Sequence, residues 1–205
     1  MSNIDRKRIA AELQRIYKDA ANEYDRAVTR DHEQQAREGA TNIRAGFAFS
    51  ENRDAAVEDI VKAGKKALAV VDGGIAAAQD SLTEPPSDEG ARYIVGLQGR
   101  SDLTQDEYDA ALSRYHGHAE QKAIIAAAKR SGFSSIYGGG NTDAETDMAD
   151  LRKLRADVQK EFNPFSFESA NPGYRAIVTG GFAAFVKPDA DAFDAFAFSG
   201  AQDGE

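Results

Sequence analysis

The sequence contains no cysteine among its 205 residues. The chain therefore has no disulfide, no thiolate zinc site, no iron–sulfur cluster and no cysteine nucleophile. It also lacks any run of 18 apolar residues, and its N-terminus leads into an amphipathic segment rather than an apolar one. We therefore expect neither a membrane partner nor a signal peptide, and a protein that is made in the cytoplasm.

Basic residues are outnumbered: 25 Lys and Arg face 34 Asp and Glu, which gives a net charge of -9. Binding to phosphate backbones depends on clustered cations, so this balance disfavours a nucleic-acid partner. The one basic cluster, Arg6-Lys7-Arg8, is followed by mixed charge at helical spacing. We interpret it as a solvated helix face.

Large apolar side chains are also scarce. Hydrophobic residues make up 41% of the chain, but 37 of them are Ala, whereas Ile, Leu, Val and Phe together number 39. Because Ala buries little area, the sequence predicts a thin core. Such a chain is stabilised by helices that pack closely through small side chains, or by surface buried against other subunits.

Helical spacing and capping residues divide the first 162 residues into four predicted helices, which makes the fold mainly α. The capping boxes Thr104-x-x-Glu107 and Thr142-x-x-Glu145 mark two of the starts. The segment Ala91–Leu97 is compatible with a helical turn or with a strand. We expect residues 1–162 to form an Ala-rich bundle with helices near 3–38, 51–80, 104–131 and 143–162.

The composition changes after residue 162, because the last 44 positions hold eight of the 11 Phe residues but only two of the 25 cations. Two runs, Tyr174–Val178 and Phe182–Val186, flank a short glycine-containing segment at residues 179–181. This pattern predicts a β-hairpin. Residues 163–205 are therefore interpreted as a second segment, distinct from the bundle.

From about residue 188 the chain alternates acids with phenylalanines, which is typical of an extended arm that docks on another protein. The acids keep the free arm soluble, and the aromatic side chains anchor it in a partner. The residues predicted to bind a partner are all aromatic: Phe193, Phe196, Phe198, Tyr174, Phe182 and Phe185.

His118-Ala-Glu120 resembles the H-x-E motif of zinc-dependent nucleobase deaminases. The match fails, because those enzymes complete their zinc site with cysteines. His116 and Glu120 are four residues apart on one predicted helical face, and the third histidine, His32, has no spacing relation to them. Two ligands do not make a metal site, so we interpret the pair as solvated and predict no metal there.

The glycine-rich segment Tyr137–Thr142 precedes a predicted helix, as phosphate-binding loops do. It is followed by Asp143, Glu145 and Asp147 and by no lysine, and these carboxylates repel phosphate. We therefore interpret it as a connector and predict no nucleotide or other cofactor. No carboxylate pair, serine motif or triad stands out among the remaining residues, so the sequence predicts no catalytic residue.

The decapeptide Leu103-Thr-Gln-Asp-Glu-Tyr-Asp-Ala-Ala-Leu112 is similar to short helix openings in structural proteins of tailed-bacteriophage virions. Helical subunits with long terminal arms also occur among the neck, scaffold and minor capsid components of such virions. The resemblance covers this decapeptide and the general architecture, and it transfers no functional residue. It implies a structural or assembly role within a virion.

Three alternative functions are compatible with these observations. The first is a non-enzymatic structural or assembly protein that self-assembles or joins a larger protein complex through its C-terminal arm, with no small-molecule substrate. The second is an intracellular adaptor or inhibitor that binds one host protein through the acidic tail. The third is an enzyme or ligand-binding helical domain, which needs a pocket lined by some of Tyr108, Tyr115, His116, His118 and Arg92.

Overall fold

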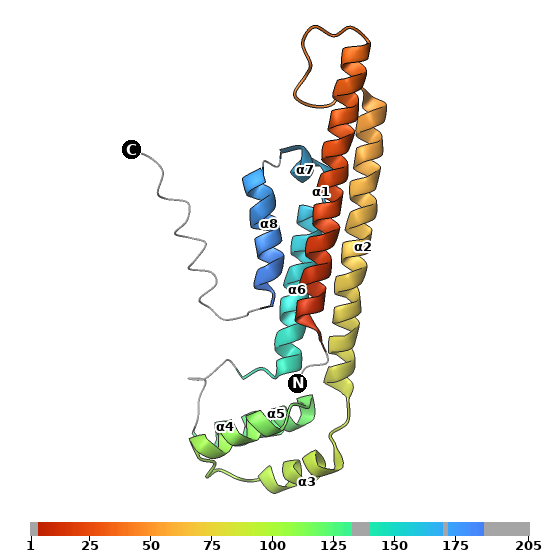
Figure 1. The fold of residues 1–205 in the computed structure, drawn as a ribbon. Coiled ribbons are helices and arrows are strands. Elements are labelled where there is room, and N and C mark those ends of the chain that lie inside the picture. Colours follow the sequence, from red (N-terminus) through yellow and green to blue (C-terminus); the bar gives the residue numbers. More distant parts are fainter. Residues whose placement is uncertain (1–3, 133–139, 170–171, 187–205) are drawn as a thin grey trace, which may run out of the picture. The chain divides into compact units, whose positions relative to one another are not determined.

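The computed structural model describes residues 4–132, 140–169 and 172–186, and all regular structure in these residues is helical (Figure 1). The prediction of a mainly α fold is confirmed. None of the described helices combines the length and apolar character needed to cross a membrane. The helices are α1 (Arg6–Arg37), α2 (Ser50–Thr83), α3 (Asp88–Leu97), α4 (Gln105–Arg114), α5 (His118–Arg130), α6 (Asp143–Glu161), α7 (Pro164–Ser169) and α8 (Pro172–Ala184).

Three of the four predicted helices correspond to single helices, namely α1, α2 and α6. The undecided segment Ala91–Leu97 is helical and belongs to α3. The prediction of one helix over 104–131 is wrong, because Tyr115 is extended and Gly117 caps the start of a separate helix, α5. The break gives no signal in the sequence, because Leu112, Tyr115 and Ala119 keep the apolar spacing of a continuous helix across it.

The contacts between residues divide the chain into two compact units. Unit 1 is built mainly from Gly73–Lys153, and unit 2 from Arg6–Asp72 together with the chain from Leu154 onward. The divisions fall inside α2 and inside α6. Each unit has its own buried residues, so each is described separately.

The core of unit 2 is aromatic and is centred on Tyr17 of α1, which is fully buried. Its ring centroid lies 5.6 Å from that of Phe162, 5.1 Å from that of Phe167 and 6.1 Å from that of Phe182. Most of these rings come from the Phe-rich last third of the sequence. The phenylalanines therefore supply the bulk that the Ala-rich helices lack.

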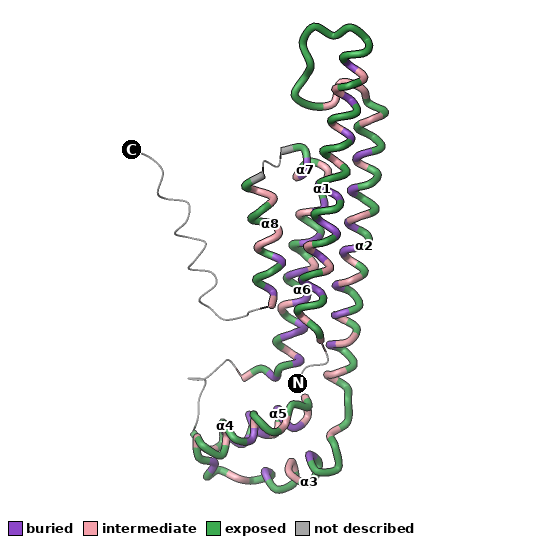
Figure 2. The backbone as a smooth tube through the Cα atoms, in the orientation of Figure 1, coloured by how far each residue is buried: buried purple, intermediate pink, exposed green. Residues whose placement is uncertain are grey.

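The prediction of a β-hairpin over Tyr174–Val186 is wrong, because most of these residues form the helix α8, which packs against α1. Its buried residues Val178 and Phe182, and the buried Phe185 that directly follows the helix, are spaced at intervals of four and three residues, which is the helical period (Figure 2). A helix satisfies its own backbone hydrogen bonds, whereas an isolated hairpin leaves half of them unpaired. Pro172 is the first residue of α8, a position that favours proline.

Polar contacts also fix α8 on α1. The Arg175 guanidinium donates two hydrogen bonds to the Asp25 carboxylate, at 2.6 and 2.9 Å. The Gln14 amide donates to the Thr179 carbonyl at 2.9 Å, and the Arg6 guanidinium lies 4.9 Å from the centre of the Phe185 ring. Residues 172–184, predicted as part of a distinct segment, thus pack on the first helix of the chain.

The loop between α1 and α2 is held by a buried carboxylate, Asp31, which is 0% exposed. Its oxygens accept hydrogen bonds from the backbone amides of Ala48 at 2.7 Å and Phe49 at 3.1 Å. The side-chain amides of Gln35 and Asn52 each donate to it at 2.8 Å. Burial raises the pKa of Asp31, but the four hydrogen bonds outweigh burial and lower that pKa to about 2.

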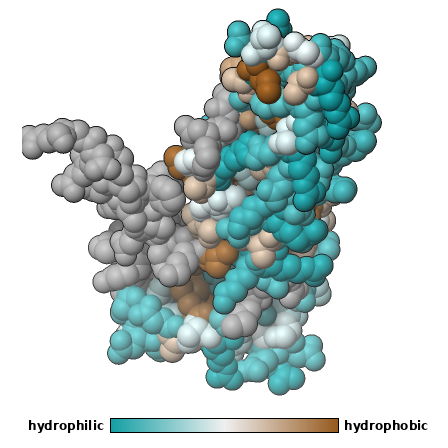
Figure 3. All heavy atoms as spheres, turned by 45° about the horizontal axis from the view of Figure 1, so that its top comes forward, coloured by the Kyte–Doolittle hydropathy of each residue, from teal (hydrophilic) through white to brown (hydrophobic). Residues whose placement is uncertain are grey.

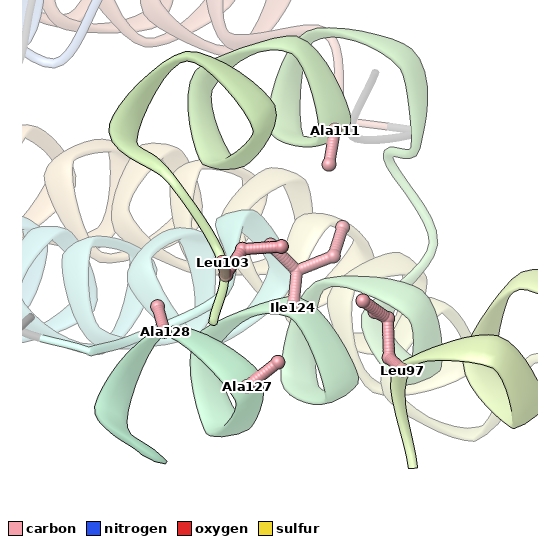
Figure 4. Packing of buried hydrophobic residues seen from close by; sticks show 6 residues of the cluster. All are labelled: Leu97, Leu103, Ala111, Ile124, Ala127 and Ala128. Atoms are coloured by element: carbon pink, nitrogen blue, oxygen red, sulfur yellow. The ribbon is translucent and has the colours of Figure 1, made fainter. Parts of the chain in front are cut away.

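Unit 1 packs α5 against both α3 and α4. Its hydrophobic cluster is small, and Leu97, Leu103 and Ile124 point toward one another within it (Figure 4). The remaining buried members are alanines, as the composition predicts. The rings of Tyr93 and Tyr115 stack at the side of this cluster, with centroids 4.4 Å apart.

Candidate functional site

A cavity of about 340 Å³ lies within unit 1. It is bordered by the end of α2, the residues that follow it, the turn between α4 and α5, and the starts of α3, α5 and α6. Its lining is mostly polar and includes Glu84, Ser87, Arg114, Tyr115, His116, His118, Glu120 and Asp143.

Three helices begin at this cavity. Ser87 caps α3, Gly117 caps α5, and Thr142 precedes α6 and accepts a hydrogen bond from the Glu145 amide at 3.3 Å. Helix N-termini carry partial positive charge and attract anions. In this chain the first turns contain their own carboxylates: Asp88 and Glu89 in α3, Glu120 in α5, and Asp143 and Glu145 in α6. These carboxylates compensate the helix dipoles, so the cavity does not favour an added anion.

Glu120 is the most buried of these acidic residues, because only 5% of its surface is exposed. Its Oε1 accepts one hydrogen bond, from the Ser87 backbone amide at 3.3 Å. That length is beyond the usual range for an N–H···O bond. A carboxylate has room for about four hydrogen bonds, so most of the acceptor capacity of Glu120 is unused.

Two glycines make room for this carboxylate. A Cβ atom at Gly90 in α3 would lie 2.1 Å from Oε1 of Glu120, and one at Gly117 would lie 2.2 Å from Oε2. Both distances are far below van der Waals contact. Any side chain at either glycine would therefore displace the carboxylate.

Hydrogen bonds between α5 and α6 fix the wall of the cavity. The buried Gln121 side chain donates to the Asp143 carboxylate and accepts from the Asp143 backbone amide, both at 2.8 Å. His118 Nδ1 shares a 2.8 Å hydrogen bond with the Thr142 hydroxyl. Beside them, the Lys122 ammonium and the Thr142 amide lower the pKa of Glu145 below its ordinary value.

The cavity contains three of the five residues named for a ligand pocket, namely Tyr115, His116 and His118. Tyr108 packs on the hydrophobic cluster, and Arg92 is exposed outside the cavity. The interpretation of His116 and Glu120 as a solvated pair is wrong for Glu120, which is buried, whereas His116 is exposed and precedes the helix. The roles of Ser87, Gly90 and Asp143 were missed, because Ser87 and Gly90 meet Glu120 only in the folded unit, and Asp143 meets Gln121 only there.

The glycine-rich segment Tyr137–Thr142 falls partly outside the described residues, which resume at Gly140. Thr142 and Glu145 form the predicted capping box, since the Thr142 amide donates to Glu145 Oε2 at 2.9 Å and its hydroxyl accepts from the Glu145 amide. In the described part of the chain, no group of three or more His, Asp or Glu residues is placed to hold a metal ion. The absence of metal and nucleotide binding at this loop stays a prediction.

The aromatic residues predicted to bind a partner fall into two sets. Phe182 and Phe185 are buried in unit 2, and the Tyr174 hydroxyl, in a half-buried side chain, donates to Glu161 at 2.8 Å. These three side chains make contacts within the chain. Phe193, Phe196 and Phe198 lie outside the described residues, so their binding to a partner stays a prediction.

No family model, no curated protein and no solved structure matches this chain.

Proposed function

We propose that the chain is a non-enzymatic assembly protein that docks on other protein subunits through α8 and the residues that follow it. The observation that carries this proposal is the solvent-facing side of α8. Its exposed residues are Gly173, Ala176, Ile177, Gly181, Ala183 and Ala184, and none of them is charged. A helix that packs on a core through one face ordinarily presents charged and polar residues on the other.

Ile177 is the largest side chain on this face and is 57% exposed. The only charged residue of α8, Arg175, is turned toward α1, where it pairs with Asp25. A second large hydrophobic residue of the same unit, Phe165 in α7, is 72% exposed. On the face drawn in Figure 3 most described residues are hydrophilic, and hydrophobic residues form small separate areas.

The chain continues from α8 into the segment that holds Phe193, Phe196 and Phe198. An uncharged helix face that leads into an acidic, Phe-rich segment supports one continuous docking element. The resemblance to virion structural proteins supports the same class of function, although Leu103 and Ala111 of the decapeptide are buried in unit 1 and have a packing role there. We extend the proposal to a component of a large protein assembly of that kind.

Removing residues 188–205 tests the proposal. We expect the truncated chain to keep its helical circular dichroism, because α8 is anchored by contacts within unit 2, and to lose self-association or capture of its natural partner. Native mass measurement of the full-length and truncated chains shows whether each one self-associates or holds a partner. The proposal is contradicted if the full-length chain has the 22.1 kDa mass of a single copy and also captures no protein from its source.

A second variant separates α8 from the terminal segment. Ile177→Lys adds a charge to the uncharged face, whereas the control Val95→Lys adds the same charge at a position of α3 that is 64% exposed. We expect only Ile177→Lys to weaken assembly. Equal assembly of both variants shows that the outer face of α8 is not the docking surface.

A further inference from the structure

We propose that the cavity beside Glu120 binds a small organic cation that carries a primary ammonium group. This inference is independent of the assembly role, because it concerns unit 1 alone. Its starting point is Glu120, a residue that is only 5% exposed, that lines the cavity, and whose carboxylate receives one long hydrogen bond at 3.3 Å. Buried carboxylates in proteins are ordinarily paired or fully hydrogen-bonded.

The Glu120 carboxylate has acceptor capacity for further hydrogen-bond donors. Oε2 of Glu120 has no hydrogen bond or ion pair in the described part of the chain, and it occupies the position that a side chain at Gly117 would take, 2.2 Å from where the Cβ atom would lie. A primary ammonium group supplies three N–H donors and a compensating charge in a small volume. It satisfies this carboxylate with charge-assisted hydrogen bonds, which are the stronger kind.

The charges around the cavity favour a cation over an anion. Three carboxylates line it, those of Glu84, Glu120 and Asp143. The basic residues of the lining have partners within the chain: Arg114 pairs with Glu89, His118 shares a hydrogen bond with Thr142, and His116 Nδ1 lies 4.0 Å from Asp143. The helix dipoles at the cavity are already compensated by carboxylates of the chain, as described above.

The volume sets the size of the ligand. At about 340 Å³ the cavity lies near the lower end of the range of roughly 300–1,000 Å³ that is typical of small-molecule sites. Pro85, Tyr115 and Ala144 give part of the lining an apolar character that suits a short aliphatic chain. An aliphatic amine or diamine of a few carbons has both features.

Titration calorimetry with 1,4-diaminobutane tests the proposal on the full-length protein at fixed salt. We expect saturable binding that Glu120→Gln weakens at least tenfold, since the amide has the same shape but no charge. Asp106→Asn, which removes an exposed carboxylate from α4 outside the cavity, is the matched control and should leave the affinity within twofold. An equal loss in both variants shows general charge attraction and overturns the proposal.

Two further measurements test whether binding depends on the position of the Glu120 carboxylate and on N–H donors, rather than on charge alone. Gly117→Ala keeps the Glu120 charge but puts a Cβ where Oε2 lies, so it should weaken binding of the diamine. Tetramethylammonium has the same charge per nitrogen as an alkylammonium but no N–H donor, and we expect no saturable binding. If 1,4-diaminobutane does not bind the wild-type chain, or if tetramethylammonium binds as well as the diamine, the proposed site is wrong.

Discussion

Asp31 in unit 2 and Glu120 in unit 1 are both buried carboxylates on Ala-rich helices, but their surroundings differ. Asp31 accepts four hydrogen bonds of 2.7 to 3.1 Å from the loop that follows α1 and from neighbouring amide side chains. Glu120 accepts one of 3.3 Å. Burying a charge is costly unless it is hydrogen-bonded, so the donors around Asp31 explain its position from within the chain. Glu120 lies in the first turn of α5, where it compensates the helix dipole, but its Oε2 accepts no hydrogen bond in the described part of the chain.

The comparison separates two uses of a buried acid. The Asp31 carboxylate orders a loop, because the amides of Ala48 and Phe49 reach it only when the chain turns back toward α1. Glu120 touches two glycines and a cavity, which leaves its second oxygen open to an external donor. The first arrangement stabilises the fold, and the second provides a place for a ligand.

The largest effect on stability is expected from Asp31→Ala. The substitution leaves four donors without their acceptor, two of them backbone amides, and we expect a loss of about 3 kcal/mol in the free energy of unfolding. Urea unfolding followed by far-ultraviolet circular dichroism measures it. The control Asp54→Ala removes an exposed carboxylate of α2 and should change the free energy by no more than about 0.5 kcal/mol. Similar losses in the two variants would refute the role of Asp31.

A smaller effect is expected from acid. The pKa of Asp31 is lowered from 3.8 in its ordinary state to about 2 in the folded chain. The stabilisation is therefore complete above about pH 4 and disappears as the pH falls through about 2, with a loss of about 2 kcal/mol. The difference in unfolding free energy between the wild type and Asp31→Ala should shrink by that amount between about pH 5 and pH 2. A difference that does not depend on pH would show that the Asp31 charge contributes nothing.

Most of the helical fold follows from local sequence signals. The capping boxes at Thr104 and Thr142 are formed as predicted, because a cap and its partner lie within four residues of each other. The break at Tyr115–Gly117 was missed because apolar spacing continues across it. The helix α8 was mistaken for a hairpin because Gly180 and Gly181 resemble a turn, whereas the packing of Phe182 on Tyr17 of α1, which favours the helix, leaves no local signal in the sequence.

The candidate site was less predictable than the fold. His118-Ala-Glu120 stood out in the sequence, but the burial of Glu120 depends on Gly90, which lies 30 residues earlier in α3. In the same way Asp31 looks like an ordinary helix-surface acid until the loop that follows α1 places two backbone amides against it. Contacts between segments this far apart leave no periodic or spacing signal in one sequence.

The most direct test of the difference between the two carboxylates is a paired measurement of unfolding free energy for Asp31→Asn and Glu120→Gln at neutral pH. The amide of Asn at position 31 turns one acceptor into a donor that faces other donors, so we expect a loss of about 2 kcal/mol. The amide of Gln at position 120 keeps an acceptor for the Ser87 amide and removes an unpaired buried charge, so we expect a change of no more than about 0.5 kcal/mol, of either sign. A loss at Glu120 equal to or greater than the loss at Asp31 would show that both carboxylates stabilise the fold in the same way, and would contradict this account.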